Sequence, residues 1–299
     1  YVAHEFFADF AKPYYFYQVA GEMPSAGLSF VGSAQLNLNF MDLAVPAEFH
    51  ARLGKSATRN ALEADGDYIR NQRFRRDVYI NRHDVMEEAE QTAVLAAIPC
   101  GTLRAVDDFK RSAEFGAVKL NYKGPVFDVL IRHLSAGART PAELKDLADF
   151  KEYPLELLID GIKFLAAGGQ MLPFARNTEP APGELLTAER YALGAPMNLA
   201  VLKRRLFQDG AIAMTAPAAG IGLEVAMSDA FLALCSAEAP ADQVADWAFQ
   251  RSIEAGQQIV SEDGDQASAL AEAVRAFRET RLPKFLEIGI LVPAPEDAG

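Results

Sequence analysis

The chain has 299 residues, of which 50% are apolar and 23% are charged, and its formal net charge is −12. This length suffices for two or three domains, and the apolar content is that of a folded protein. The acidic balance argues against nucleic acid or an anionic membrane as a partner, because both require a basic face.

The first 40 residues are expected to form two helices and a strand. Apolar residues recur at helical spacing within the first ten positions. Pro13 suits the first position of a second helix, and Gly27 is expected to end it. Residues 28–31 then have the composition of a strand.

Four consecutive aromatic residues, Tyr14, Tyr15, Phe16 and Tyr17, follow this proline. On a helix such a run faces all directions, so at least two of the rings are expected to be buried. This pattern favours a core or an interface over a ligand-stacking site. Tyr15 is retained as a candidate contact for a substrate or another domain.

Arginines are concentrated at one place in this acidic chain, where Arg70, Arg73, Arg75, Arg76 and Arg82 lie within thirteen residues. The forked guanidinium group suits carboxylate or phosphate recognition. Arg70, Arg73 and Arg76 are therefore candidate substrate or interdomain contacts. The alternative is that the arginines pair with carboxylates of this same chain.

Several strands are expected around and after the arginines. If residues 73–78 form a strand, alternate side chains face opposite ways, and Phe74 points into a core. Residues 77–81 also have strand composition. Residues 101–106 and 116–122 are expected to pair with each other.

A domain boundary is expected at Gly124, and a winged helix after it. Residues 126–134 form its first helix, and Thr140 begins a capping box for the second. Pro154 opens the third helix, and residues 170–174 would be the wing strand. Residues 126–176 contain six basic and seven acidic residues, which favours protein contact over DNA binding.

The rest of the chain is expected to be mostly helical. Residues 176–183 form a linker, and helices are predicted over 199–207, 242–258 and 266–281. Residues 212–215 and 223–226 are predicted to pair as a hairpin. Gly220 and Gly222 are then turn residues, because a cofactor-binding glycine loop precedes a helix rather than a strand.

The two cysteines, Cys100 and Cys235, lie in apolar surroundings and are expected to be buried thiols. No zinc-ligand spacing is present in the sequence. His4 and Glu5 are neighbours on a predicted helix and point about 100° apart, so they do not chelate one metal ion.

Three stretches resemble one protein family. They are the His4-Glu5-Phe6 motif with the aromatic run behind it, the glycine-flanked residues 26–32, and the arginine-rich residues 67–77. Together they resemble bacterial S-adenosylmethionine (SAM)-dependent methyltransferases that carry a methyltransferase regulatory domain. The resemblance places His4 and Glu5 among the candidate substrate or interdomain contacts.

The predicted elements give an α+β fold in three parts: a regulatory domain over residues 1–123, a winged-helix-like domain over 124–176 and a mostly helical module over 184–299. The resemblance implies the non-catalytic regulatory or substrate-recognition portion of a methyltransferase. Because the glycine-rich loop of a SAM site is missing from the sequence, this portion is expected to be inactive alone and without cofactor, metal or catalytic residues of its own. SAM is then the cofactor of the full-length parent. The alternative is a winged-helix transcriptional regulator with an effector domain.

The resemblance also implies partners. Because the chain starts at Tyr1, within an apolar stretch, we expect an N-terminal catalytic domain to precede it. A protein substrate is expected, since some relatives act on protein lysine, and dimerisation is a further role open to this part. Nucleic acid and membrane are not expected, and the predicted location is the cytoplasm.

Overall fold

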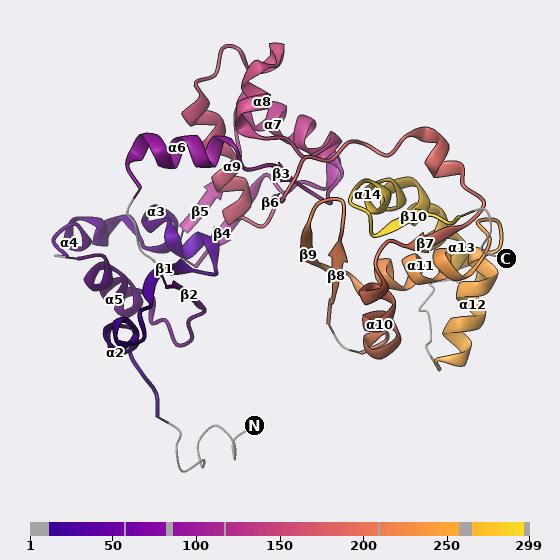
Figure 1. Cartoon of the computed structure of the whole chain (residues 1–299), viewed down its shortest axis with the longest axis horizontal. Coiled ribbons are helices and arrows are strands. Elements are labelled where there is room, and N and C mark those ends of the chain that lie inside the picture. Colours follow the sequence, from indigo (N-terminus) through magenta and orange to yellow (C-terminus); the bar gives the residue numbers. More distant parts are fainter. Residues whose placement is uncertain are drawn as a thin grey trace. The chain divides into compact units, whose positions relative to one another are not determined.

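A computed structural model describes residues 12–56, 58–81, 86–116, 118–208, 210–256 and 265–295. Helices alternate with short strands along this part of the chain (Figure 1). The described strands pair antiparallel in five two-stranded sheets. The predicted α+β class is confirmed.

The chain divides into two compact units. Unit 1 comprises residues 1–91, 110–123 and 163–169, and unit 2 comprises residues 92–109, 124–162 and 170–299. Helices α6 (Glu88–Ala96) and α9 (Leu155–Ala167) contribute residues to both units. The three-part organisation with boundaries after residues 123 and 176 stays a prediction.

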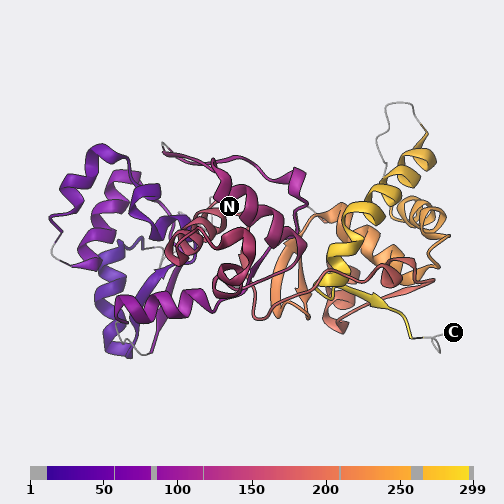
Figure 2. The same cartoon turned by 90° about the horizontal axis from the view of Figure 1, so that it is seen from above.

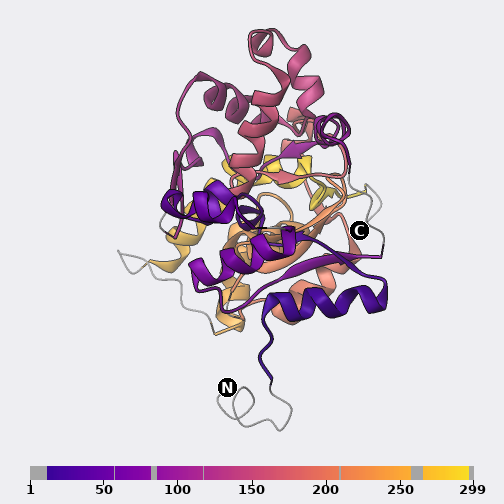
Figure 3. The same cartoon turned by 90° about the vertical axis from the view of Figure 1, so that its left-hand side faces the viewer.

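Unit 1 is built around helices α2 (Phe16–Glu22) and α5 (Arg59–Arg70) and the antiparallel strands β1 (Ser29–Ser33) and β2 (Asp77–Ile80) (Figure 3). Phe16, Ala20 and Phe30 are buried together, and Tyr79 packs against them. This shared apolar burial holds α2 against the two strands.

Local signals set the ends of these elements. The Thr58 hydroxyl accepts a hydrogen bond from the backbone N–H of Ala61 at 3.2 Å and caps α5, which Asn71 ends with a φ of 52°. Gly27, with a φ of 71°, ends the 3₁₀ turn that follows α2, so its predicted stop role is confirmed. The predicted start at Pro13 is wrong, because α2 begins at Phe16.

Shorter elements complete unit 1: η1 (Met23–Ala26), η2 (Leu36–Asn39), α3 (Met41–Ala44), η3 (Ala47–Phe49), α4 (His50–Leu53), β4 (Ser112–Phe115) and β5 (Val118–Asn121). Strand β5 pairs with β4, so its predicted pairing with residues 101–106 is wrong. A two-residue connection that includes Gly116, with a φ of 59°, favours the local hairpin over a distant partner.

Unit 2 begins with β3 (Cys100–Gly101) and η4 (Val106–Asp108). The elements that the winged-helix prediction concerned follow: α7 (Pro125–Ala136), α8 (Pro141–Asp146), η5 (Ala148–Phe150), α9 and β6 (Leu172–Pro173). Thr140 and Glu143 form the predicted capping box. Leu158 and Ile162 of the third helix are buried as predicted. The partner of β6 is β3, which precedes the first helix, so the winged-helix fold is not confirmed.

The remainder of unit 2 is mostly helical, with η6 (Gly183–Thr187), β7 (Tyr191–Leu193), α10 (Pro196–Arg205), β8 (Ile212–Ala216), β9 (Ile221–Val225), α11 (Met227–Glu238), α12 (Val244–Glu254), α13 (Gln266–Thr280), α14 (Leu282–Glu287) and β10 (Leu291–Pro293). Helices α12 and α13 lie side by side (Figure 2). Strands β8 and β9 form the predicted hairpin, and Gly220 lies in its turn with a φ of 70°. The prediction that the C-terminal part of the chain is mostly helical is confirmed.

Within the described ranges, every helix is too short or too polar to cross a membrane. The same ranges contain no cluster of histidine, cysteine, aspartate and glutamate that suits a metal ion.

Candidate functional site

A pocket of about 660 Å³ lies in unit 1, bordered by α2, α5, β2 and the chain that joins α5 to β2. This volume is typical of ligand-binding pockets. Its walls combine aromatic rings with charged and amide side chains. It is lined by Tyr14, Tyr15, Phe16, Tyr17, Val19, Met23, Ala64, Asp67, Tyr68, Asn71, Gln72, Arg73, Arg75, Asp77 and Tyr79.

The tyrosines of this pocket are unusually exposed. Tyr14, Tyr15 and Tyr17 each have more than half of their surface accessible, and of the four consecutive aromatics only Phe16 is buried. The prediction that at least two would be buried is therefore wrong. Tyr15 is the N-cap of α2 and Tyr14 precedes it, so only Phe16 and Tyr17 follow the helical periodicity.

Three of the exposed rings lie against one another. The ring centroids of Tyr15 and Tyr17 are 5.8 Å apart with planes inclined by 10°, so these two rings are stacked. Those of Tyr15 and Tyr68 are 5.9 Å apart with planes inclined by 33°, so this pair is tilted. Tyr68 is also more than half exposed, and it reaches Tyr15 from α5. The three rings thus join two helices while leaving ring surface open to solvent.

Arg75 is the centre of an ionic network behind these rings. Its Nε donates to Asp77 at 2.9 Å, its Nη1 to Asp67 at 2.7 Å and its Nη2 to Glu63 at 3.1 Å. The guanidinium carbon also lies 4.1 Å from the ring centroid of Phe16. Only 13% of the Arg75 side chain is exposed. Burial opposes its charge, but the hydrogen bonds to Asp77 and Asp67 outweigh burial and raise the pKa of Arg75.

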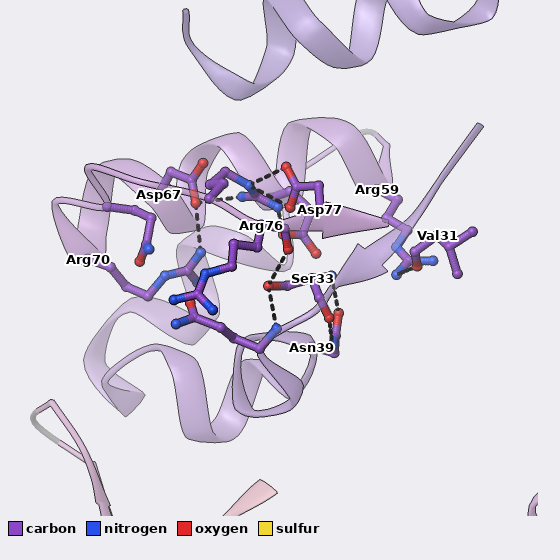
Figure 4. A network of polar contacts seen from close by, with 12 residues as sticks. Val31, Ser33, Asn39, Arg59, Asp67, Arg70, Arg76 and Asp77 are labelled. Atoms are coloured by element: carbon purple, nitrogen blue, oxygen red, sulfur yellow. Dashed lines mark hydrogen bonds and ion pairs between the residues drawn. The ribbon is translucent and has the colours of Figure 1, made fainter. Parts of the chain in front are cut away.

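Arg70 belongs to the same network, although an arginine that contacts a substrate or another domain would be largely unpaired in this chain. Its Nη2 donates to Asp67 at 2.8 Å and its side chain is 10% exposed (Figure 4). Its Nε and Nη1 are buried without a hydrogen-bond partner in the described part of the chain. The alternative interpretation, pairing within the chain, holds for Arg70 and Arg75.

Arg73 and Arg76 lie apart from this network. Both are exposed, and neither side chain forms a hydrogen bond or ion pair with a residue that the structure describes. Arg73 lines the pocket and Arg76 does not. Their availability for an external contact is consistent with the prediction for these two residues.

The strand predicted over residues 73–78 is wrong at its start. Residues 72–76 have no regular secondary structure, and β2 begins at Asp77. Phe74 is 76% exposed rather than buried in a core. Pairing of Arg75 with Asp77 and with two residues of α5 fixes this connection in place of a strand ladder.

Two polar atoms of the residues that line the pocket have no hydrogen-bond partner among the described residues. Asp67 receives both guanidinium donors at Oδ1, so its Oδ2 accepts no hydrogen bond from the residues described. The Tyr79 hydroxyl is buried and has no partner within the same ranges. Burial and the neighbouring Asp77 raise the pKa of Tyr79, so its phenol is neutral at physiological pH.

Other residues singled out in the sequence lie elsewhere. His4, Glu5 and Arg82 fall outside the described residues. Cys100 and Cys235 are buried as predicted, and burial raises their pKa values to about 11 and about 12. They are therefore protonated and unreactive at neutral pH.

The sequence identified neither Arg75 as an ionic centre nor Tyr68 as a pocket residue. Glu63 and Asp67 are four residues apart on α5, so they share one helical face. That spacing beside an arginine-rich stretch is the signal that could have indicated an internal partner for Arg75. Nothing in the spacing of Tyr68 indicated that it would meet Tyr15.

Residues 1–81 match the family described as "Predicted methyltransferase regulatory domain". The resemblance inferred from sequence is confirmed. Every residue that lines the pocket lies within this matched segment.

Two similar proteins extend the comparison over the whole chain. The uncharacterized protein sll1526 of Synechocystis sp. (strain ATCC 27184 / PCC 6803 / Kazusa) is 23% identical over 297 residues, which are 97% of this chain and 57% of that protein. The structure of PKMT2 from Rickettsia typhi in complex with AdoHcy has a TM-score of 0.63 at 13% identity. The matched region covers 97% of this chain and 60% of the PKMT2 chain.

A second structure of PKMT2 from Rickettsia typhi has a TM-score of 0.60 at 13% identity, over 98% of this chain and 61% of that one. At such identity the likeness shows a shared fold. The chain thus spans less than two thirds of each of these relatives. Together, the domain match and the shared fold support a methyltransferase-related role.

Proposed function

We propose that this chain is the non-catalytic regulatory and substrate-recognition portion of a SAM-dependent methyltransferase. The observation that carries the proposal is that the segment matched to the regulatory domain, residues 1–81, contains the complete lining of the tyrosine pocket. PKMT2 supports it, because that protein has this fold over 60% of its length and was solved with AdoHcy.

The described residues do not suit SAM. A SAM site of the usual kind has a glycine-rich turn between a strand and a helix, where the backbone approaches the cofactor. Gly220 instead lies in the turn between strands β8 and β9, and Gly222 lies within β9, paired with Thr215. A residue with a side chain at position 220 would place its Cβ only 2.7 Å from the Cβ of Ala175. Gly220 therefore serves close packing within unit 2. SAM binding is therefore assigned to a separate catalytic domain.

The chain is accordingly expected to neither bind SAM nor transfer a methyl group. Titration calorimetry of residues 1–299 with SAM should give no binding heat. Circular dichroism of the same sample should show the helical content of a folded protein, as a control. Micromolar affinity for SAM would refute the proposal that SAM binds to a separate catalytic domain and not to this chain.

The pocket is tested in the methyltransferase that contains this chain. Arg73→Ala is expected to lower kcat/KM for methyl transfer to the protein substrate at least about fivefold, because interface arginines are common binding hot spots. Radiolabelled SAM provides the readout on proteins of the source cell. The matched control is Arg204→Ala, which removes an exposed arginine of α10 in unit 2.

Equal activity of the Arg73→Ala and Arg204→Ala enzymes would exclude the pocket as a substrate or interdomain contact. If kcat/KM falls because KM rises while kcat stays unchanged, Arg73 contributes to binding of the substrate. Unchanged melting temperatures of both variants are expected, because neither arginine has an internal partner among the described residues.

A further inference from the structure

The tyrosine pocket offers aromatic faces rather than a net charge. Its charged lining residues are two acids, Asp67 and Asp77, and two bases, Arg73 and Arg75. Because these charges balance, simple Coulomb attraction selects neither an anion nor a strongly hydrated cation. The rings of Tyr15, Tyr17 and Tyr68, each more than half exposed, are the remaining source of selectivity.

Cations already lie on aromatic faces at both sides of this segment. The Lys12 ammonium nitrogen lies 5.1 Å from the ring centroid of Tyr14, which lines the pocket. On the inner side, the Arg75 guanidinium covers the Phe16 ring. The negative face of an aromatic ring attracts such cations, and the attraction is largest for cations that lose little hydration on binding.

We propose that this pocket binds the trimethylammonium group of a methylated lysine side chain in a protein. Methylation spreads the charge of the ammonium group over an apolar surface and weakens its hydration, which suits the exposed tyrosine rings. The Oδ2 of Asp67, which accepts no hydrogen bond from the described residues, supplies a partial negative charge, because the Oδ1 of the same carboxylate already pairs with Arg70 and Arg75.

This assignment rests on the proposed function and extends it. Methyl transfer to the neutral amine of a lysine, formed when its ammonium group loses a proton, yields a methylated ammonium, so the ligand belongs to the class of product that a lysine-modifying enzyme releases. The pocket would then recognise a protein that has already been modified. The cavity of about 660 Å³ accommodates such a side chain together with neighbouring backbone.

The test is equilibrium binding of three peptides to residues 1–299. They share one sequence and differ at one side chain: lysine, trimethyl-lysine, or its uncharged analogue with a tert-butyl group in place of trimethylammonium. Fluorescence anisotropy of a labelled peptide gives Kd. The trimethylated peptide is expected to bind at least about fivefold more tightly than either of the others.

Variants then locate the binding. Tyr15→Leu and Tyr68→Leu keep apolar surface but remove a ring, and each should weaken binding of the trimethylated peptide at least about fivefold. Tyr15→Phe and Tyr68→Phe keep the ring and should bind nearly as well. Phe74→Leu is the matched control, because Phe74 is an exposed aromatic of the same unit that does not line the pocket.

Equal affinity for the lysine and trimethyl-lysine peptides would overturn the proposal, and so would equal affinity for the uncharged analogue. Loss of binding in Phe74→Leu to the same extent as in Tyr68→Leu would also overturn it. The methyl-transfer assay of Arg73→Ala is independent of these outcomes. The ligand assignment can therefore fail while the proposed function stands.

Discussion

Replacing Arg75 with alanine is expected to destabilise unit 1 by about 3–5 kcal/mol, because the change leaves buried carboxylates without their counter-charge. Arg75 donates to Glu63, Asp67 and Asp77, and 7–16% of each carboxylate side chain is exposed. Asp67 retains Arg70, whereas Glu63 and Asp77 have no other ion pair in the described part of the chain. The substitution also removes the cation from the Phe16 ring.

The measurement must report unit 1 alone. Hydrogen exchange of backbone amides in β1 and β2 does so, because these strands frame the network. Protection should fall in Arg75→Ala and remain in Arg73→Ala, which removes an exposed arginine two positions away. At lower pH the loss of protection in Arg75→Ala should be smaller, since a protonated carboxyl group no longer requires a counter-charge. Equal protection in both variants would show that the network contributes little to stability.

Lys284→Ala is expected to destabilise unit 2 by about 3–5 kcal/mol, because it leaves the buried carboxylate of Glu287 without its counter-charge. Lys284 Nζ donates to Glu287 at 2.7 Å and to the backbone oxygen of Ser135. Only 3% of the Glu287 side chain is exposed, and its Oε1 accepts a hydrogen bond from Thr178 at 2.6 Å. Without Lys284 the buried carboxylate keeps the Thr178 hydroxyl as its principal donor.

The single tryptophan, Trp247 in α12, lies in unit 2, so its fluorescence during urea unfolding reports this loss. The control is the double variant Lys284→Met, Glu287→Leu, which removes both charges and should retain most of the stability. If the double variant is as unstable as Lys284→Ala, lost packing rather than an unpaired charge is the cause.

The pH dependence of unit 2 follows from the same carboxyl group. Burial raises the pKa of Glu287 above its ordinary value of 4.5, and Lys284 opposes part of this shift. Because the folded-state pKa is the higher one, the contribution of Glu287 to stability is fully present below pH 4.5. That contribution is lost as the pH rises through the folded-state pKa. In Lys284→Ala the carboxyl pKa rises further, so the loss of stability should be smaller in acid.

Much of the fold was determined by features that are local in the sequence. The capping box of Thr140 and Glu143 starts α8, and the apolar stripe that includes Leu158 and Ile162 is buried on α9. The hairpin around Gly220 also formed as predicted. Each of these needs only residues within a few turns or a few positions, where propensity, capping and periodicity act directly.

The candidate site depended on the tertiary structure. Glu63 and Asp67 meet Arg75 because Asn71 ends α5 and the chain turns back into β2, which the sequence did not indicate. The same turn leaves Arg73 and Phe74 exposed and brings Tyr68 against Tyr15. The sequence alone determined the fold class, the capped helices and the family resemblance. Only long-range packing decided which arginines are neutralised and which tyrosines stay accessible, because each outcome depends on the position of a partner from another element.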